Sequence, residues 1–416
     1  MSETAGSPKH GGNAFLFVIV CVTLDMLAFG MIIPVMPDLL VELTHLPVEK
    51  AVAWAGPLTA TFALTNFLAM PTLGGLSDRF GRRPVLLVSM ATLAVDFVIM
   101  GLASALWVLF LGRFLSGISS ATYSTANAYI ADTTTPEKRG QAFGMIGAAF
   151  GIGFVLGPAI GGLIGQIDSR APFYAAAVVA ALNVLYGLFV LPESLKPESR
   201  RSFDVARSNP LGAFAHFSKL PKVAWFLVGL VFAALAHTVY PSTWSFHGEI
   251  RYDWGAREIG LSLAAVGVSS ALVQIALMGP ILKWLGTVRT LVWGLLINIV
   301  SFTAFAFADA AWFALAIIPF SALGGVAGPA NNTIMSNLTP ENAQGELHGA
   351  TASINALAMI ISPLIMTQTL YSFASGITPV YFPGAAFLLA AVLTGLALIP
   401  VSAGIRANRE QTSQIA

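Results

Sequence analysis

Apolar runs recur along the chain at a length that suits a membrane crossing. A helix needs roughly 20 mostly apolar residues to cross the hydrocarbon core. Runs of about that length cover residues 14–36, 52–74, 84–103, 106–130, 141–165, 171–191, 223–245, 259–281, 290–308, 311–335, 349–370 and 379–402. Helices are expected because backbone groups in lipid must find their hydrogen-bond partners within the segment. The pattern therefore predicts an all-α integral membrane protein with twelve transmembrane helices.

The composition agrees with lipid as the main solvent. Hydrophobic residues make up 56% of the chain and charged residues 10%, whereas soluble domains carry about 25% charged residues. The net charge of +1 argues against a nucleic-acid partner. Cys21 is the single cysteine, so no intrachain disulfide is possible. The polar start "MSETAGSPKHGGN" has no cleavable signal pattern, and we expect the run from Ala14 to be a membrane segment.

The basic residues set the orientation of these spans. With both termini in the cytoplasm, sixteen of the 21 Lys and Arg fall on the inside, including Lys9, Arg207 and Lys219 in the termini and the central linker. Only Lys50, Arg170, Arg251 and Arg257 fall outside, and Arg113 lies within a span. This asymmetry follows the positive-inside rule and predicts cytoplasmic termini.

The chain contains two related halves. A polar stretch separates six spans from six, which predicts an N-terminal bundle over 1–191, a cytoplasmic linker over 192–221 and a C-terminal bundle over 222–416. At an offset of about 205 residues the halves share landmarks, which pair Gly74 with Gly279, Gly81 with Gly286 and Pro158 with Pro363. Repeats of six helices with a substrate site between them are typical of secondary transporters.

Two glycine-containing stretches predict local structure, a turn in one and close helix packing in the other. "GGLSDRFGRR" joins the second and third spans, where Gly74 and Gly81 would allow a tight turn and Arg79, Arg82 and Arg83 would anchor it inside. Asp78 would accept hydrogen bonds from a nearby helix N-terminus, where the helix dipole favours an anion; a topology anchor alone is the alternative. In the fifth span, Gly153, Gly157 and Gly161 line one helix face and Pro158 invites a bend. We interpret that face as tight packing that seals a contact between helices 5 and 8.

Few ionisable residues lie within the spans, and such residues suggest function by default. Asp25 is placed near the midplane and is the best candidate for a proton carrier, because burial disfavours its charged form. A cationic or metal-chelated cargo would compete with the proton for this carboxylate. The alternative is that Asp25 pairs permanently with Arg113 and only locks the helices together. Asp96 and Arg113 are expected at one level nearer the outside, with Asp96 away from the central cavity.

Three polar residues of the second half are further candidates for the substrate site. His237 titrates near neutral pH, although a lone histidine near a helix end is commonly a satisfied polar residue. Gln274 and Asn298 are expected to line the cavity.

Three motifs together resemble the major facilitator superfamily. They are "GGLSDRFGRR", "GFVLGPAIGG" with Gly162 as its last glycine, and "LGRFLSG" around Arg113; the last two are typical of its drug–proton antiporter branch. The chain is most similar to the tetracycline–proton antiporters, through "VTLDMLAFGMIIPVMPDLL", "AYIADTTTPEKRGQAFG" and "GEIRYDWGAREIGLSLA". It departs from them at Asn298, where they have an acid, and at Ser269 and Ser270, where they have a histidine.

The resemblance implies two pseudo-symmetric six-helix bundles in a bacterial inner membrane and proton-driven efflux. It matches the acids of helices 1 and 3 to Asp25 and Asp96. It also implies that the Gly74–Arg83 stretch latches onto the start of helix 11 in the outward-facing state. We therefore predict a monomeric proton-coupled antiporter that exports small amphipathic, tetracycline-like drugs, with protons as coupling ion and no cofactor.

Two alternatives stay open on the sequence. A proton-coupled transporter could import a sugar or other small metabolite, although the glycine pattern of helix 5 argues against it. A membrane enzyme or receptor is the other alternative. The sequence shows no metal-ligand cluster, no nucleotide-binding loop and no Ser/His/Asp arrangement that would support it.

Overall fold

The computed structural model describes residues 11–120, 122–201 and 221–413, and every regular element among them is helical. The first half comprises α1 (Gly11–Met31), η1 (Ile33–Val35), α2 (Met36–Thr44), α3 (Val48–Phe80), α4 (Arg82–Gly101), α5 (Leu106–Ser119), α6 (Thr122–Thr133), α7 (Pro136–Gly165), α8 (Ala171–Val190) and η2 (Pro197–Ser199). The second half comprises α9 (Ala224–His237), α10 (Val239–Tyr252), α11 (Ala256–Leu272), η5 (Val273–Leu277), α12 (Met278–Phe307), α13 (Ala311–Leu323), η6 (Gly324–Val326), α14 (Ala327–Leu338), η7 (Glu341–Ala343), α15 (Gln344–Ala374), α16 (Ala385–Ala407) and α17 (Arg409–Ser413). Lys9, Arg207, Lys219 and most of the predicted linker lie outside the described residues.

The helices account for the predicted membrane crossings. Ten continuous helical stretches of the described chain are long and apolar enough to span a membrane. One of them, 256–307, has 52 residues and would be roughly 78 Å long if straight. It crosses twice, because Gly286 has φ 71° and ψ 167° and reverses the chain. The predicted fourth span is divided into α5 and α6, since α5 ends at Ser119.

Some predicted span ends are wrong. The first span was expected to end at residue 36, but helical structure continues through η1 and α2 to Thr44. The second was expected over 52–74, whereas α3 runs from Val48 to Phe80. Polar residues such as Glu49 and Arg79 extend the helix at both ends without interrupting its backbone hydrogen bonds, so hydropathy alone misses these turns.

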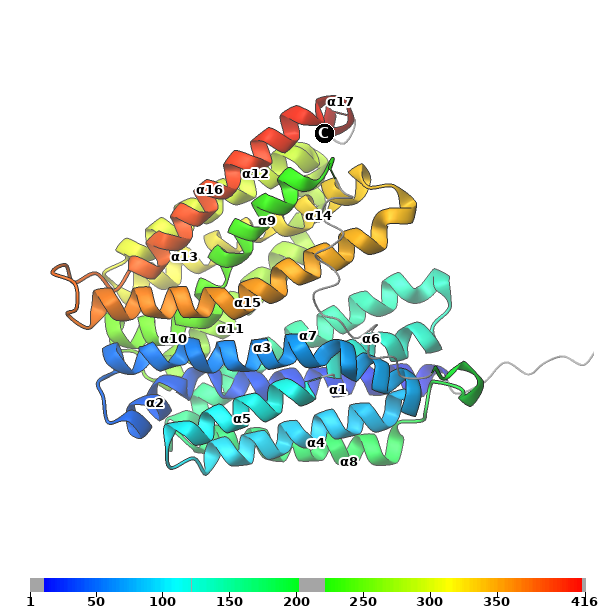
Figure 1. Cartoon of the computed structure of the whole chain (residues 1–416). Helices are drawn as coiled ribbons and strands as arrows, with labels where there is room; N and C mark the ends of the chain where they lie inside the picture. Colours follow the sequence, from blue (N-terminus) through cyan, green and yellow to red (C-terminus); the bar gives the residue numbers. More distant parts are fainter. Residues whose placement is uncertain (1–10, 121, 202–220, 414–416) are drawn as a thin grey trace, which may run out of the picture.

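The two halves form two six-helix bundles that repeat one design (Figure 1). The chain leaves the helical region at the paired glycines Gly81 and Gly286, which have φ 108° and 71° and thus adopt a conformation that L side chains rarely adopt. Pro158 and Pro363 lie within the long helices α7 and α15. Between the bundles, α3 packs on α15 and α7 packs on α11, as a pseudo-twofold arrangement requires.

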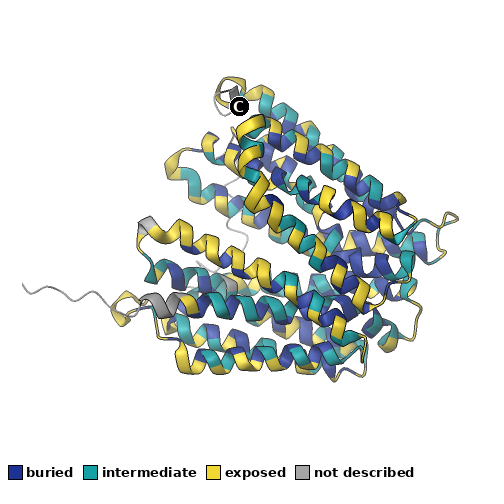
Figure 2. Cartoon of the chain, turned by 180° about the vertical axis from the view of Figure 1, so that it is seen from behind, coloured by how far each residue is buried: buried dark blue, intermediate teal, exposed yellow. Residues whose placement is uncertain are grey.

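The bundles touch at one end and diverge at the other, where α1 begins and α16 ends (Figure 1). At the touching end, a Cβ on Gly162 would lie 3.0 Å from the Cα of Gly260. Nearer the start of α7, the helix of Gly162, a Cβ added to Gly144, Gly147 or Gly151 would have no neighbouring atom within 4 Å. Figure 2 shows buried residues along the inward helix faces and exposed residues at the diverging tips. We call these the closed end and the open, termini-bearing end.

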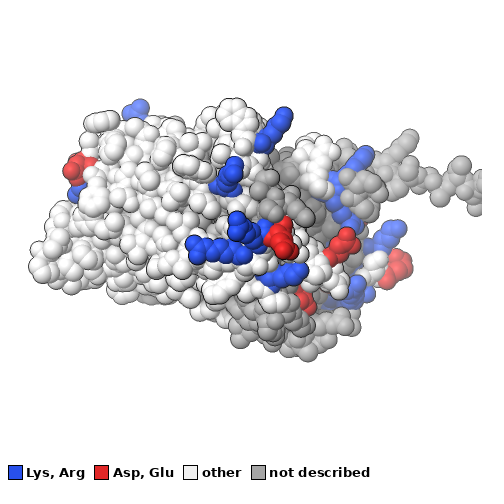
Figure 3. Space-filling model, turned by 90° about the horizontal axis from the view of Figure 1, so that it is seen from above, with Lys and Arg blue, Asp and Glu red and all other residues white. Residues whose placement is uncertain are grey.

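The outer surface fits a bilayer. Large apolar side chains are exposed along the outer helix faces, and most of the face seen in Figure 3 carries no charge, its Lys and Arg lying mainly in the half toward the termini. Exposed tryptophans lie near both ends, with Trp107 and Trp312 toward the closed end and Trp284 toward the open end. Tryptophan is enriched at membrane–water interfaces, so these positions mark the two edges of the bilayer.

Candidate functional site

Asp25 is enclosed inside the N-terminal bundle. It lies on α1, a helix whose neighbours α7 and α8 cover it, and only 2% of its surface is exposed. Asn183 of α8 donates a hydrogen bond from Nδ2 to Asp25 Oδ1 over 2.8 Å. Thr122 of α6 adds a side-chain hydrogen bond to the carboxylate. Among the described residues, no cation forms an ion pair with Asp25, so hydrogen bonds alone support its charge.

Asp96 has a different partner. Arg113 of α5 donates from Nη2 to Asp96 Oδ2 of α4 over 2.8 Å, and both side chains are almost fully buried. The guanidinium also contacts Met100 Sδ and lies 5.7 Å from the ring centre of Phe62. The expected proximity of Asp96 and Arg113 is therefore confirmed. The alternative in which Asp25 pairs with Arg113 is wrong, because the guanidinium is aimed at α4 and not at α1.

The glycine face of α7 contacts α1. A Cβ on Gly153, Gly157 or Gly161 would meet the backbone of residues 23–31, so close backbone approach is required at all three positions. The expectation that this face contacts the eighth membrane helix, which is α11, is wrong. The contact with α11 comes from the neighbouring positions Pro158 and Gly162, whose backbones approach Gly260. Helix α7 is continuous through Pro158.

The charged stretch between the second and third membrane helices forms its own ion pairs at the open end. Arg82 contacts Asp78 over 2.6 Å and Asp132 of α6 over 3.1 Å. The carboxylate at the N-terminus of α4 belongs to Glu193, which accepts hydrogen bonds from the backbone N–H groups of Arg82 and Arg83 over 2.8 and 3.2 Å. Asp78 does not occupy that position.

One glycine of this stretch was misinterpreted from the sequence. Gly81 forms the tight turn, and a Cβ there would meet the Glu193 carboxylate. Gly74 does not turn the chain, because it lies inside α3, six residues before the helix ends. Its surroundings are open, with no atom within 4 Å of an added Cβ. In a helix, hydrogen bonding continues through a glycine that no neighbour forces to bend.

The polar candidates of the C-terminal bundle fall into two places. Gln274 and Asn298 donate to the backbone carbonyls of Gly325 and Gly324 over 3.4 and 3.2 Å, so both contact the short 3-10 segment η6 that divides the tenth membrane helix. Gln274 itself lies in the π-helical segment η5, a rare conformation that often marks functional sites. His237 is exposed at the end of α9 and stands edge-on to Tyr240, with ring centres 5.5 Å apart.

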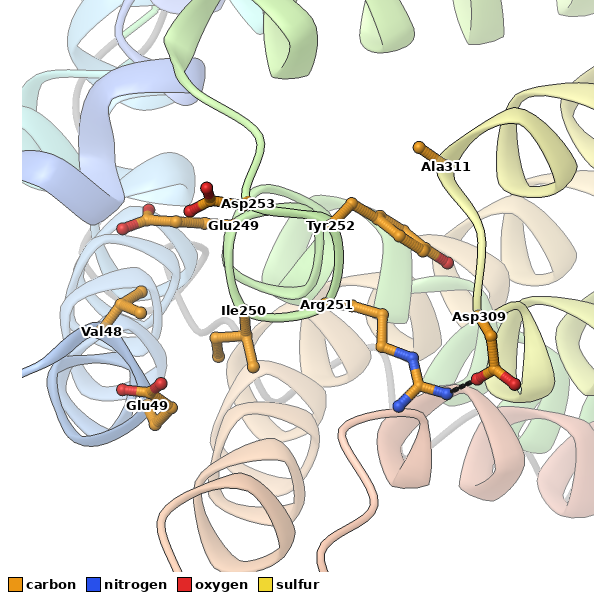
Figure 4. A pocket seen from close by; sticks show the side chains of 9 residues that line it. All are labelled: Val48, Glu49, Glu249, Ile250, Arg251, Tyr252, Asp253, Asp309 and Ala311. Carbon is orange, nitrogen blue, oxygen red and sulfur yellow. Dashed lines mark hydrogen bonds and ion pairs between the residues drawn. The ribbon is translucent and has the colours of Figure 1, made fainter.

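Sequence reasoning missed two features. One is Asn183, a single amide in the apolar stretch "AALNVLYGLFV", which a search for polar residues in spans would have found. The other is a pocket of about 560 Å³ at the closed end, between α3, α10 and the chain before α13. Figure 4 shows Glu249 and Asp253 on the side of α10 that faces Glu49, and Arg251 paired with Asp309 on the other side. These residues lie next to the ends of spans, where charged residues are common and do not by themselves indicate a site.

The buried charged groups of the site are two acids with different partners. No group of three or more His, Cys, Asp or Glu suited to a metal ion occurs in the part of the chain that the structure describes. What the site offers is one buried acid held by neutral donors, a second acid neutralised by arginine, and bundles that separate at one end only.

Comparisons with known proteins agree with this architecture. The model of the Major Facilitator Superfamily matches residues 18–363. The chain is 39% identical to the class C tetracycline resistance protein of Escherichia coli, over 87% of this chain and 91% of that protein. It is 38% identical to the class G tetracycline resistance protein of Vibrio anguillarum, over 88% and 92% of the two chains.

A solved structure shares the fold at low sequence identity. It is that of a bacterial homologue of the human lysosomal transporter Spinster in an inward-facing, occupied conformation, with a TM-score of 0.76, 16% identity and coverage of 98% and 99% of the two chains. The match of the family model and the identity to these relatives cover most of the sequence. The chain therefore belongs to the Major Facilitator Superfamily, a family of multi-pass membrane transporters, in the group that contains the tetracycline resistance proteins.

Proposed function

We propose that this protein is a proton-coupled antiporter that exports small amphipathic, tetracycline-like drugs from the bacterial cytoplasm by alternating access. The observation that carries the proposal is Asp25, a carboxylate that is 2% exposed and supported by hydrogen bonds without a paired cation. Burial of such a carboxylate disfavours its charged form, and binding of a proton removes this cost. Relatives named for tetracycline resistance favour a drug over a sugar as the cargo.

In this proposal Asp25 carries the proton and the Asp96–Arg113 ion pair stays intact throughout the cycle. The guanidinium of Arg113 engages the Asp96 carboxylate over 2.8 Å. Asp96 and Arg113 then support coupling by fixing α4 against α5 in the same bundle. Cargo that carries a cation or a chelated metal ion would compete with the proton for Asp25, which would have to become accessible for direct contact.

The open end is assigned to the cytoplasm. The described ends of the chain, at Gly11 and Ser413, and most basic residues seen in Figure 3 lie at this end, in agreement with the positive-inside rule. The structure then corresponds to the state that accepts cargo from inside, with His237, Gln274 and Asn298 as candidate cargo contacts. The protein acts as a monomer with bundles over 1–191 and 222–416 joined by the linker 192–221, and it has no nucleic-acid partner.

The Gly74–Arg83 stretch acts in the opposite state. When the open end closes, the bare surface at Gly74 would allow α15 to approach α3, and Asp78 would accept hydrogen bonds from the N-terminus of α15. In the present state Asp78 is held by Arg82. Exchange of this partner within the N-terminal bundle for an interbundle partner would make the stretch, with Arg79, Gly81 and Arg83, a conformational latch.

The proposal can be tested in cells and in everted membrane vesicles. Expression of the full-length chain in a pump-deficient bacterium should raise resistance to tetracycline or to another amphipathic drug of a panel. Everted vesicles should accumulate that drug when their interior is acidified, and Asp25→Asn should abolish the response while protein remains in the membrane. Unchanged resistance across the panel, or uptake that ignores the pH gradient, would contradict the proposal.

A further inference from the structure

The hydrogen bonds of Asn183 connect the proposed proton carrier to a helix that does not face the other bundle. Asn183 is completely buried on α8. Its Nδ2 donates both to Asp25 Oδ1 over 2.8 Å and to the backbone carbonyl of Cys21 over 3.0 Å. A primary amide has two N–H groups, so these two acceptors use both of them.

This pairing fixes which face of the amide Asp25 meets. The carbonyl of Cys21 can only accept a hydrogen bond, so the amide nitrogen must point toward it. If the amide were turned by 180°, Asn183 Oδ1 would face the acceptor oxygens of Cys21 and Asp25, and both hydrogen bonds from Nδ2 would be lost. The Oδ1 atom of Asn183 has no hydrogen-bond partner among the described residues. The amide therefore presents a donor to Asp25 whether or not the carboxyl is protonated.

From this geometry we infer that Asn183 is a positioning residue that sets the proton affinity of Asp25, and the inference rests on the proposed function of Asp25. A donor to a carboxylate favours the ionised form and opposes the effect of burial. Without Asn183, only Thr122 would support the charge, and Asp25 would hold its proton to higher pH.

Among the groups around Asp25, Asn183 is the main hydrogen-bond donor that opposes the effect of burial on its proton affinity. On α1 the titratable neighbour is Cys21, a buried thiol. On α8, Tyr186 lies beyond Cys21 and stacks on Phe17. From α7 glycine backbone and apolar side chains such as Ile146 and Ala149 pack against α1, and from α6 Thr122 contributes a neutral hydroxyl. Since Arg113 is engaged by Asp96, no cation in the described chain replaces the lost donor.

The test compares Asn183→Leu with wild type in the purified full-length protein. Protonation of the buried carboxyl is followed by infrared difference spectroscopy across pH, with Asp25→Asn identifying the band. We expect the midpoint to rise by about one pH unit, which is a tenfold change in proton affinity. Asn66→Leu is the matched control, because Asn66 of α3 donates to the carbonyl of Ser120 over 2.9 Å and does not contact Asp25; it should leave the midpoint unchanged.

Transport provides the second measurement and separates the two proposals. In liposomes with tetracycline and Mg²⁺ as the probe, Asn183→Leu should shift the pH profile by the same amount without changing the affinity for the probe at high pH. If the infrared midpoint does not move, the role of Asn183 is wrong, whatever the transport result. If the midpoint moves but wild-type transport ignores the pH gradient, the antiport proposal fails and the positioning role stands. Asn183→Ala removes the same donor without added bulk if the leucine variant does not fold.

Discussion

The two acids inside the N-terminal bundle should respond in opposite ways to the same substitution. Replacement of aspartate by asparagine removes one charge and preserves size. At Asp25 the partners are neutral donors, so an asparagine can still accept the hydrogen bond from Asn183. At Asp96 the partner is the guanidinium of Arg113. We therefore expect Asp25→Asn to abolish coupling with little loss of stability, and Asp96→Asn to destabilise the bundle.

The size of the second effect follows from burial. The Asp96 side chain is 0% exposed and that of Arg113 is 8% exposed, and removal of one partner from a buried ion pair costs about 3–5 kcal/mol. Arg113 keeps its contacts with Met100 and the Phe62 ring, which places the expected loss near the lower limit, about 3 kcal/mol. For a domain of this size such a loss lowers the melting temperature by on the order of 10 °C. Asp25→Asn should cost less than about 1 kcal/mol.

Cys21 gives a direct assay of unfolding. It is the single cysteine of the chain and is buried in the N-terminal bundle. A thiol-reactive dye added during a thermal ramp in detergent should therefore report the opening of this bundle. The double variant Asp96→Leu with Arg113→Leu should recover most of the loss, because no charge is left unpaired. The reasoning is refuted if Asp96→Asn melts like wild type, or if Asp25→Asn loses as much as Asp96→Asn.

The remaining predictions concern conformational exchange. Gly162→Val should force the closed end apart, because the added carbons meet backbone and not a mobile side chain; distances between spin labels across that end should lengthen, whereas Gly151→Ala, which meets nothing within 4 Å, should leave them unchanged. Glu249→Gln removes a negative charge from the closed-end pocket, which Glu49 of α3 also lines. Because the repulsion between the two acids is lost, the same spin-label distances should shift toward the shorter population; longer distances would contradict this electrostatic argument. Asp78→Ala should slow turnover in everted vesicles without weakening affinity for the exported drug, and a large loss of affinity would count against the latch.

The sequence predicts the fold well because lipid imposes simple rules on it. A membrane crossing must be helical and apolar over a fixed length, so a count of apolar runs recovers six helices in each half. The turns at Gly81 and Gly286 can also be predicted from the sequence, because a reversal of the chain there requires a positive φ, which glycine adopts readily. Helix ends are less predictable, since polar residues in the headgroup region support helix and loop equally well, as at Val48–Phe80.

Side-chain partners could not be deduced in the same way. Asp25, Asp96 and Arg113 were identified as candidates because charges in spans are costly. Which acid faces the arginine depends on how α1, α4 and α5 are rotated about their axes, and apolar helices surrounded by lipid carry little periodic signal that fixes rotation. The same uncertainty hid the contact of the Gly153–Gly161 face with α1. Rotation is set by packing among neighbours, which a single sequence does not display.

The two bundles share a scaffold but differ in where they carry charge. In the N-terminal bundle, Asp25 and Asp96 lie fully inside the spans, one supported by an amide and one by arginine. In the described C-terminal spans the matching interior positions are neutral, and Asn298 donates to a helix break in η6. In the proposed cycle a proton that binds to the first bundle changes the charge of that bundle alone, whereas the second can vary its polar surface without disturbing Asp25. From this division we expect substitutions around η5 and η6 to alter cargo specificity without changing the dependence of transport on the pH gradient.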